Sequence, residues 1–272
     1  MATGIGVGMN AFVSKNLGQH NQEGVNKSAL HGIFLELINY LIFLCIGLFV
    51  VNKFMKTQTN IAEIVDSGTT YLRIVCICSF GIFTQVSFER LLQSTGKTLL
   101  SMTTQLTGAI INIILDPILI FGLFGMPKLG IAGAAIATVI GQIIAGIFAV
   151  VLNIKKNKEI HLHLKGFKLE KKYIGRILYV GVPSVLMVAI GSVMSYGMNL
   201  ILMTFSSTAV AVFGAYYKLQ SFVFMPIFGL NNGMVPIVSF NLGAKNKDRL
   251  VKTVKLGVCY AVGIMLIGLV II

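Results

Sequence analysis

Long apolar stretches separated by short polar segments constrain the fold of this chain more than any other feature. Residues 33–51 and 99–124 each carry a single charged side chain, and both reach the length of about 18 residues that crosses a bilayer. Inside lipid the backbone must satisfy its own hydrogen bonds, so only helices and closed barrels can span. The stretches lack the alternating polarity of barrel strands. The pattern therefore predicts an all-α membrane protein, a multi-pass helical bundle.

The composition supports this prediction and limits the chemistry. Hydrophobic residues make up 56% of the chain and charged residues 11%, with a mean hydropathy of +0.86. The net charge of +13 does not indicate nucleic acid, because the basic residues cluster between the expected spans, in contact with lipid headgroups and water. The four cysteines lie in apolar stretches at spacings that fit no disulfide framework or zinc site. We expect no bound metal, no nucleic-acid partner and no catalytic site.

The polar segments define a topology. A polar link at 52–67 follows the span at 33–51, and we expect further spans at 71–88, 129–154, 177–205, 208–240 and from Val254 onward, with residues 1–14 as the end of another. The segments 15–27, 90–97, 155–176 and 245–255 hold 17 Lys or Arg, whereas the alternate segments hold three. Since basic loops stay on the cytoplasmic side, we expect these four segments in the cytoplasm of a cell-membrane protein.

One stretch of the chain occurs twice. Residues 9–32 recur at 234–257 without a gap, so each residue has a counterpart 225 positions later. The identical pairs are Met9/Met234, Val13/Val238, Ser14/Ser239, Asn16/Asn241, Leu17/Leu242, Gly18/Gly243, Asn21/Asn246, Lys27/Lys252 and Gly32/Gly257. The repeat indicates two pseudo-symmetric lobes, an N-lobe at 1–154 and a C-lobe at 177–272, joined by the basic linker 155–176. We expect Asn16/Asn241 and Gly18/Gly243 to be turn residues.

Several motifs resemble those of MATE (multidrug and toxic compound extrusion) transporters, and the resemblance covers the whole chain. They are the duplicated S-x-N-L-G, the N-x-x-x-D-P-x-x-x-F-G from Asn112 to Gly122, the small-residue run from Gly130 to Thr138, and the G-V-P from Gly181 to Pro183. The resemblance implies a twelve-helix fold of two lobes related by a pseudo-two-fold axis. It also implies that the chain is truncated at both ends and holds the end of helix 2 to helix 9.

The resemblance further implies a function. MATE proteins are secondary active antiporters that export drugs and other cationic or amphipathic small molecules in exchange for H⁺ or Na⁺, usually as monomers and without a further cofactor. The same superfamily contains flippases for lipid-linked saccharides, which line their cavity with several arginines. The four arginines here, Arg73, Arg90, Arg176 and Arg249, do not lie deep in an expected span. A membrane enzyme is the weakest reading, because no H-E-x-x-H motif is present.

Asp116 is the most informative single residue. A carboxylate within a span is costly, by at least about 2.5 kcal/mol at the bilayer centre, so it pairs, protonates or lines a cavity. Asn112 lies four residues earlier, on the same helical face. The family resemblance implies that Asn112, Asp116 and Thr138 form a cation or proton coupling site. The alternative is that Asp116 caps a turn broken by Pro117.

Other polar side chains lie within the expected spans. Lys218, Gln220, Met225 and Asn231 are candidates for lining the substrate cavity of the second lobe, although Lys218 could instead pair with a carboxylate elsewhere. Glu36 is expected to reach the membrane surface from just inside its span. Glu89 and Arg90 are expected to form an ion pair at a cytoplasmic helix end.

Overall fold

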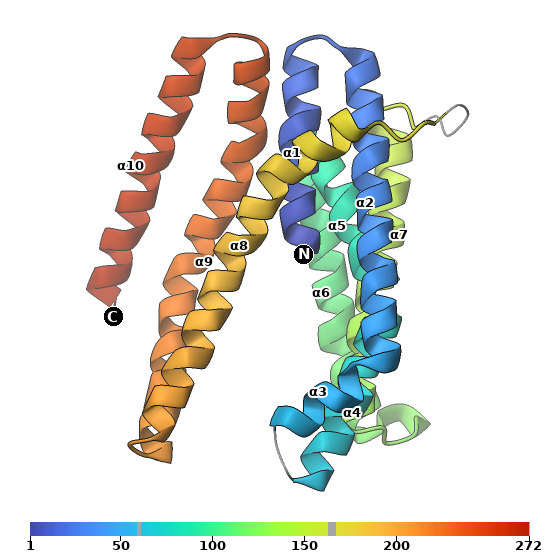
Figure 1. Ribbon diagram of the computed structural model, residues 1–272, viewed down its shortest axis with the longest axis vertical. Helices are drawn as coiled ribbons and strands as arrows, with labels where there is room; N and C mark the ends of the chain where they lie inside the picture. The colour runs from blue at the N-terminus through green and yellow to red at the C-terminus, as the bar shows by residue number, and fades with distance from the viewer. Residues whose placement is uncertain (59–60, 163–166, 272) are drawn as a thin grey trace.

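The computed structural model describes residues 1–58, 61–162 and 167–271, and the regular structure in these ranges is entirely helical (Figure 1). The helices are α1 (Ala2–Gly18), α2 (Gln22–Phe49), α3 (Val51–Gln58), α4 (Ala62–Ile77), α5 (Phe80–Ser94), α6 (Thr98–Phe121), the 3₁₀ turn η1 (Leu123–Gly125), α7 (Ile131–Lys156), α8 (Lys171–Met203), α9 (Ser207–Gly243) and α10 (Lys247–Ile271). Among the described residues, six helices are long and apolar enough to cross a membrane. The expected multi-pass helical protein is confirmed.

Helices α2, α8, α9 and α10 begin earlier than the apolar stretches that predict them, because each starts in polar sequence. Helix α2 starts at Gln22, where the side chain of Asn21 accepts a hydrogen bond from the backbone of Gly24 (3.0 Å). The repeat counterpart of this cap is Asn246, which accepts from the backbone of Arg249 (3.1 Å) at the start of α10. Such caps satisfy N–H groups that have no partner inside the helix.

The expected span at 71–88 is broken. Helices α4 and α5 are bent by 47° at the break between them, and together they form one further candidate span. At the break, the hydroxyl of Ser79 donates to the carbonyl of Cys76 (2.7 Å), which partly replaces the lost backbone bonding. The polar link expected at 52–67 is mostly helical in its described part, where it forms α3 and the first turns of α4.

The expected turn residues have a different role. Gly18 and Gly243 each end a helix, and the positive φ angles of the two following turns fall on His20 (54°) and Lys245 (55°), which are repeat counterparts. Asn16 and Asn241 lie inside the helices, where each side-chain amide donates to the carbonyl four residues earlier. The repeat thus reproduces local geometry closely, but the turn positions predicted from sequence are wrong.

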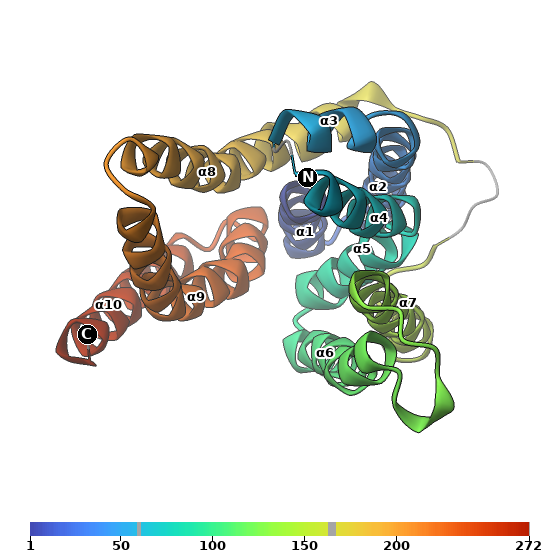
Figure 2. The ribbon, with the colours of Figure 1, turned by 90° about the horizontal axis from the view of Figure 1, so that it is seen from below.

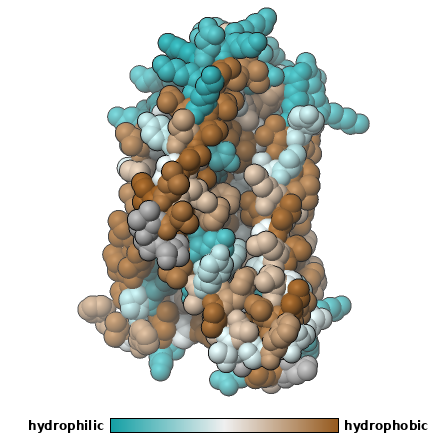
Figure 3. Space-filling model, turned by 90° about the vertical axis from the view of Figure 1, so that its left-hand side faces the viewer, coloured by the Kyte–Doolittle hydropathy of each residue, from teal (hydrophilic) through white to brown (hydrophobic). Residues whose placement is uncertain are grey.

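The four basic segments gather at one end of the molecule, which we call the basic end (Figures 1 and 3). The start of α2 is tied to the segment after α7, since Gln22 donates to the carbonyl of Glu159 (2.7 Å) and Asn26 accepts from the backbone of His161 (2.9 Å). Lys97 reaches Glu159 from the α5–α6 connection (3.4 Å). The segment between the two helices is shorter than 155–176, because α7 continues to Lys156 and α8 begins at Lys171.

Helix α1 joins two groups of helices, α2–α7 and α8–α10. It packs with α2 and α5 around an apolar cluster that includes Met9, Val13 and Leu91. On its other side, Gly4 and Gly8 lie directly against α8 near Gly181 and Ile177, where any side chain would overlap. Helices α8 and α9 meet α1 near the basic end, α10 packs against α9, and all three diverge from α2–α7 toward the opposite end (Figures 1 and 2).

Candidate functional site

The candidate site lies between α6 and α7, which pack tightly through glycines. Gly108 on α6 faces the carbonyl of Gly141 on α7, and Gly141 in turn faces Gly108 and the side chain of Asn112. The connection after α6 folds back on the helix, with the backbone N–H of Leu129 donating to the carbonyl of Leu119 (3.0 Å). The small residues of the G-x-A-G-A-A run let the two backbones come close enough for their polar side chains to meet.

The three residues predicted as a coupling site come together. The amide nitrogen Nδ2 of Asn112 lies 3.3 Å from Oδ1 of Asp116 and 3.3 Å from Oγ1 of Thr138. The hydroxyl of Thr138 donates to the carbonyl of Ala134 (2.9 Å), so its oxygen is free to accept from the amide. Asn112 therefore bridges the two helices and binds the carboxylate with the same group.

Asp116 does not cap a broken turn. Helix α6 continues through Pro117 to Phe121, and Gly122 ends it with a left-handed conformation (φ 75°). The carboxylate is half-buried, and no Lys or Arg forms an ion pair with it in the part of the chain that the structure describes. A half-buried carboxylate within a candidate span, with no cationic side chain paired to it, suits a group that takes up a proton or a cation.

The oxygens of Asp116, Asn112 and Thr138 are the hard ligands that small cations prefer. In the geometry observed, however, Asn112 turns its N–H₂ group toward both neighbours, so its own oxygen points away from the carboxylate. A proton on Asp116 needs no change at Asn112, whereas a cation shared by all three residues requires the amide to rotate. An amide orientation follows from the surrounding hydrogen bonds, which here both need a donor.

The four predicted cavity residues divide between two faces of α9. Lys218 and Met225 are seven residues apart, close to two turns, and Asn232 lies a further seven along the same face. Asn232 contacts Arg90 of α5 (3.2 Å), so this face is turned toward α1–α7. Gln220 and Asn231 fall on the opposite face. The structure thus does not bring the four residues together.

Two acidic residues lie elsewhere than the sequence suggested. Glu36 is 2% exposed and therefore does not reach the membrane surface, and it receives a hydrogen bond from Asn39 (3.3 Å). Glu89 does not pair with Arg90, because neighbours on a helix point in different directions. It is 4% exposed and faces α6. The sequence shows where the acidic residues lie along the chain, but the direction of the Glu89 side chain becomes clear only from the packing of α5 on α6.

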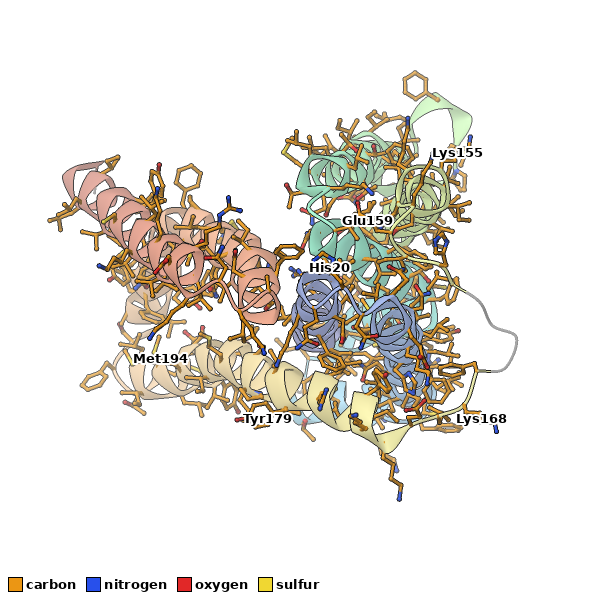
Figure 4. All side chains as sticks on the ribbon, turned by 90° about the horizontal axis from the view of Figure 1, so that it is seen from above. His20, Lys155, Glu159, Lys168, Tyr179 and Met194 are labelled. Atoms are coloured by element: carbon orange, nitrogen blue, oxygen red, sulfur yellow. The ribbon has the colours of Figure 1, made fainter. Side chains whose placement is uncertain are left out.

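A cavity of about 870 Å³ lies at the basic end, between the last turn of α1, the α5–α6 connection and the last turns of α9. Its lining includes His20, Glu159 and Phe240, and it contains none of the predicted cavity residues. Seen from this end, His20 and Glu159 lie toward the middle, whereas Lys155 and Lys168 lie toward the outside (Figure 4).

Curated relatives of this chain are multidrug exporters. The chain is 31% identical over 250 residues to the multidrug export protein MepA of Staphylococcus haemolyticus, a match that covers 92% of this chain and 54% of that protein. It is 28% identical over 269 residues to MepA of Staphylococcus aureus strain MSSA476, covering 96% of this chain and 57% of that protein. The chain thus spans little more than half the length of these relatives.

Solved structures show the same fold. A MOP superfamily transporter from Pyrococcus furiosus matches with a TM-score of 0.91 at 24% identity, over 97% of this chain and 58% of that one. A multidrug resistance MATE family transporter in an outward-facing conformation matches with a TM-score of 0.89 at 24% identity, over 98% and 58%. The family model MatE matches residues 1–118 and 183–272. The chain therefore belongs to the MatE family.

Proposed function

We propose that this chain belongs to a secondary active antiporter that exports drugs or other cationic and amphipathic small molecules from the cell in exchange for H⁺ or Na⁺. The observation that carries the proposal is the contact of Asn112 with both Asp116 and Thr138 across α6 and α7. Such a carboxylate can couple ion movement to a rearrangement of the helices that hold it. The multidrug relatives supply the substrate class.

In this proposal Asp116 is the coupling group and Asn112 and Thr138 position it. The orientation of the Asn112 amide favours H⁺ as the coupling ion, because proton binding leaves both hydrogen bonds of the amide in place. Cargo would enter between the N-lobe, residues 1–154, and the C-lobe, residues 177–272. The antiporter would act as a monomer, with its basic end in the cytoplasm.

The substrate-facing residues follow from the two faces of α9. Lys218 and Met225 share the face that contacts Arg90, and we propose that they line the space between the lobes. Gln220 and Asn231 would line the space among α8, α9 and α10. Flexible thioethers such as Met225 suit varied apolar substrates.

The test is Asp116→Asn in inverted membrane vesicles, with export of a fluorescent cationic dye driven by an imposed pH or sodium gradient. We expect the gradient-driven rate to fall at least about tenfold, the size of effect that loss of about 1.4 kcal/mol of coupling produces. Asp66→Asn is the matched control, since Asp66 is exposed on α4. Unchanged export by Asp116→Asn would contradict the coupling role, and the absence of any gradient-driven export in the unaltered protein would contradict the antiporter itself.

A further inference from the structure

A second buried carboxylate lies one helix away from the candidate coupling site. Oε1 of Glu89 accepts hydrogen bonds from Nε2 of Gln85 (2.9 Å) and from the hydroxyl of Thr104 (2.9 Å). Its other oxygen, Oε2, accepts from Nε2 of Gln105 (2.9 Å). The carboxylate is therefore held between α5 and α6 by three neutral donors, and it takes no part in the site at Asp116.

Within the described ranges, the charged side chains of α5 and of the helices that pack against it do not neutralise Glu89 by direct contact. Arg90 follows it on α5 but donates to Gln93 (2.9 Å) and Asn232 (3.2 Å). Glu36 on α2 is acidic and itself buried. From α6 the contacts come from Thr104 and Gln105, and no Lys or Arg within the described ranges forms an ion pair with Glu89. A buried carboxyl group of this kind can exist in either protonation state, because its hydrogen bonds come from groups without charge.

The hydroxyl of Thr104 has two acceptors and one proton. It lies 2.9 Å from Oε1 of Glu89 and 2.7 Å from the carbonyl oxygen of Ser101, one turn earlier on α6. A hydroxyl can donate to only one of them at a time, but its oxygen can also accept. Thr104 is fully buried, so water does not compete for either bond.

We propose that Glu89 is a second proton-binding site of the antiporter and that Thr104 is the switch that serves both of its states. When Glu89 is ionised, Thr104 donates its proton to Oε1. When a proton from water binds to Oε1, the new O–H donates to the oxygen of Thr104, and the hydroxyl of Thr104 turns to the carbonyl of Ser101. Each state keeps every polar atom bonded, so Glu89 gains or loses a proton without a change in packing.

The location of Glu89 connects it to the proposed function, on which this inference rests. Gln105 and Asn112 are seven residues apart on α6, hence on one face and about 10 Å from each other along the axis. Glu89 lies at the end of this face nearer the basic end, and Asp116 lies at the other. A proton taken up at Asp116 on one side of the membrane can thus be matched by release at Glu89 on the other.

The experiment is infrared difference spectroscopy of the purified transporter in lipid, comparing acid with alkaline buffer and the presence with the absence of a cationic dye. The unaltered protein should show a protonated-carboxyl band that disappears at high pH and has a component from each proton-binding site. Glu89→Gln should lose one component of this band, and Asp116→Asn should keep that component. Dye binding and gel-filtration behaviour establish that each variant is folded. Persistence of the whole band in Glu89→Gln would overturn the proposal.

Thr104→Val tests the switch separately. It removes a donor to the ionised carboxylate, a stronger bond than the one lost from the neutral form, so the pH at which the band is half lost should rise by about one unit. Thr107→Val is the matched control, because the hydroxyl of Thr107 donates to the carbonyl of Thr103 (2.8 Å) and does not contact Glu89. An equal pH midpoint in Thr104→Val and the unaltered protein would remove Thr104 from the mechanism. Gradient-driven export that fails in the unaltered protein would instead contradict the proposed antiporter, whatever the spectra show.

Discussion

Gly18 and Gly243, which are counterparts in the repeat, pack reciprocally across the junction of α1 and α9. Gly18 lies against the carbonyl of Phe240, and Gly243 lies against the carbonyl of Lys15, which is itself the repeat counterpart of Phe240. A Cβ atom on either glycine would overlap with the opposite backbone. The two copies of the duplicated segment therefore meet each other at the basic end, where this contact joins α1 to α9.

Replacing either glycine should weaken this junction. Gly18→Ala and Gly243→Ala should each destabilise the protein by about 1–3 kcal/mol, because the backbones must separate to admit the methyl group. Thermal unfolding of the purified protein in detergent measures the effect as a fall of several degrees. Gly214→Ala on α9 is the control, since no atom of the described residues lies within 4 Å of the added Cβ. If Gly214→Ala lowers the unfolding temperature as much as Gly243→Ala, the junction does not depend on close approach.

The bridging role of Asn112 predicts an order of effects at the candidate site. Asn112→Ala removes the donor to the Asp116 carboxylate, a charge-assisted bond of about 1.5–3 kcal/mol, and should reduce gradient-driven dye export about tenfold or more. Thr138→Val removes only a neutral acceptor and should have a smaller effect. Thr103→Val serves as control, because the exposed Thr103 bonds only within its own helix. An equal or larger loss in Thr138→Val than in Asn112→Ala would show that Asn112 is not the bridge.

The sequence predicted the class of fold and the three residues that meet at the candidate site. The length of an apolar stretch determines whether a helix can span the membrane. The four-residue spacing of Asn112 and Asp116 places them on one face of α6, however that helix packs against its neighbours. Thr138 was reached through the family resemblance. The Asn112–Thr138 contact requires the backbones of α6 and α7 to lie close together. This close approach depends on Gly108 and Gly141, which face each other across the two helices.

The features that the sequence did not predict depend on which neighbouring helix each side chain faces. Glu89 and Arg90 are neighbours in the sequence, which favours the prediction of an ion pair. In the helix, however, Glu89 points toward α6 and Arg90 points toward α9. The break at Ser79 is also not predicted, because no proline marks it and a glycine such as Gly81, two residues later, can equally lie inside a helix. The positive φ angles of the two turns occur at His20 and Lys245 and not at the nearby glycines. Gly18 and Gly243 instead lie inside the contact between α1 and α9, where a side chain would overlap with the opposite backbone.

The neighbouring asparagines of α9 should differ sharply in their contribution. Asn232→Ala removes one of the two acceptors of the half-buried Arg90 guanidinium, which keeps its hydrogen bond to Gln93 (2.9 Å), and this loss should cost about 1 kcal/mol. Asn231→Ala changes an exposed side chain on the other face and should stay within about 0.5 kcal/mol of the unaltered protein. Denaturant unfolding of the two variants measures the difference. Equal stability would mean that the Arg90–Asn232 contact does not hold α9 to α5.

His31 anchors the start of α8 to α2. Its Nδ1 lies 2.7 Å from the carbonyl of Lys27 and its Nε2 accepts from the backbone of Glu170 (2.9 Å), an arrangement that requires the neutral ring with the proton on Nδ1. The ring also stacks on Tyr173, with centroids 5.1 Å apart. His31→Phe keeps the stacking and loses both hydrogen bonds, so it should cost about 1–3 kcal/mol.

His31→Ala loses the stacking as well and should cost about 0.5–1.5 kcal/mol more than His31→Phe. Limited proteolysis within 155–176 should follow the same order, because His31 holds the end of this linker against α2. Lys27→Met is the control, since its ion pairs with Glu23 and Glu170 (2.8 and 2.7 Å) are largely solvated and such pairs contribute little. If Lys27→Met accelerates cleavage more than His31→Phe, then surface charge, and not the buried imidazole, fixes the linker.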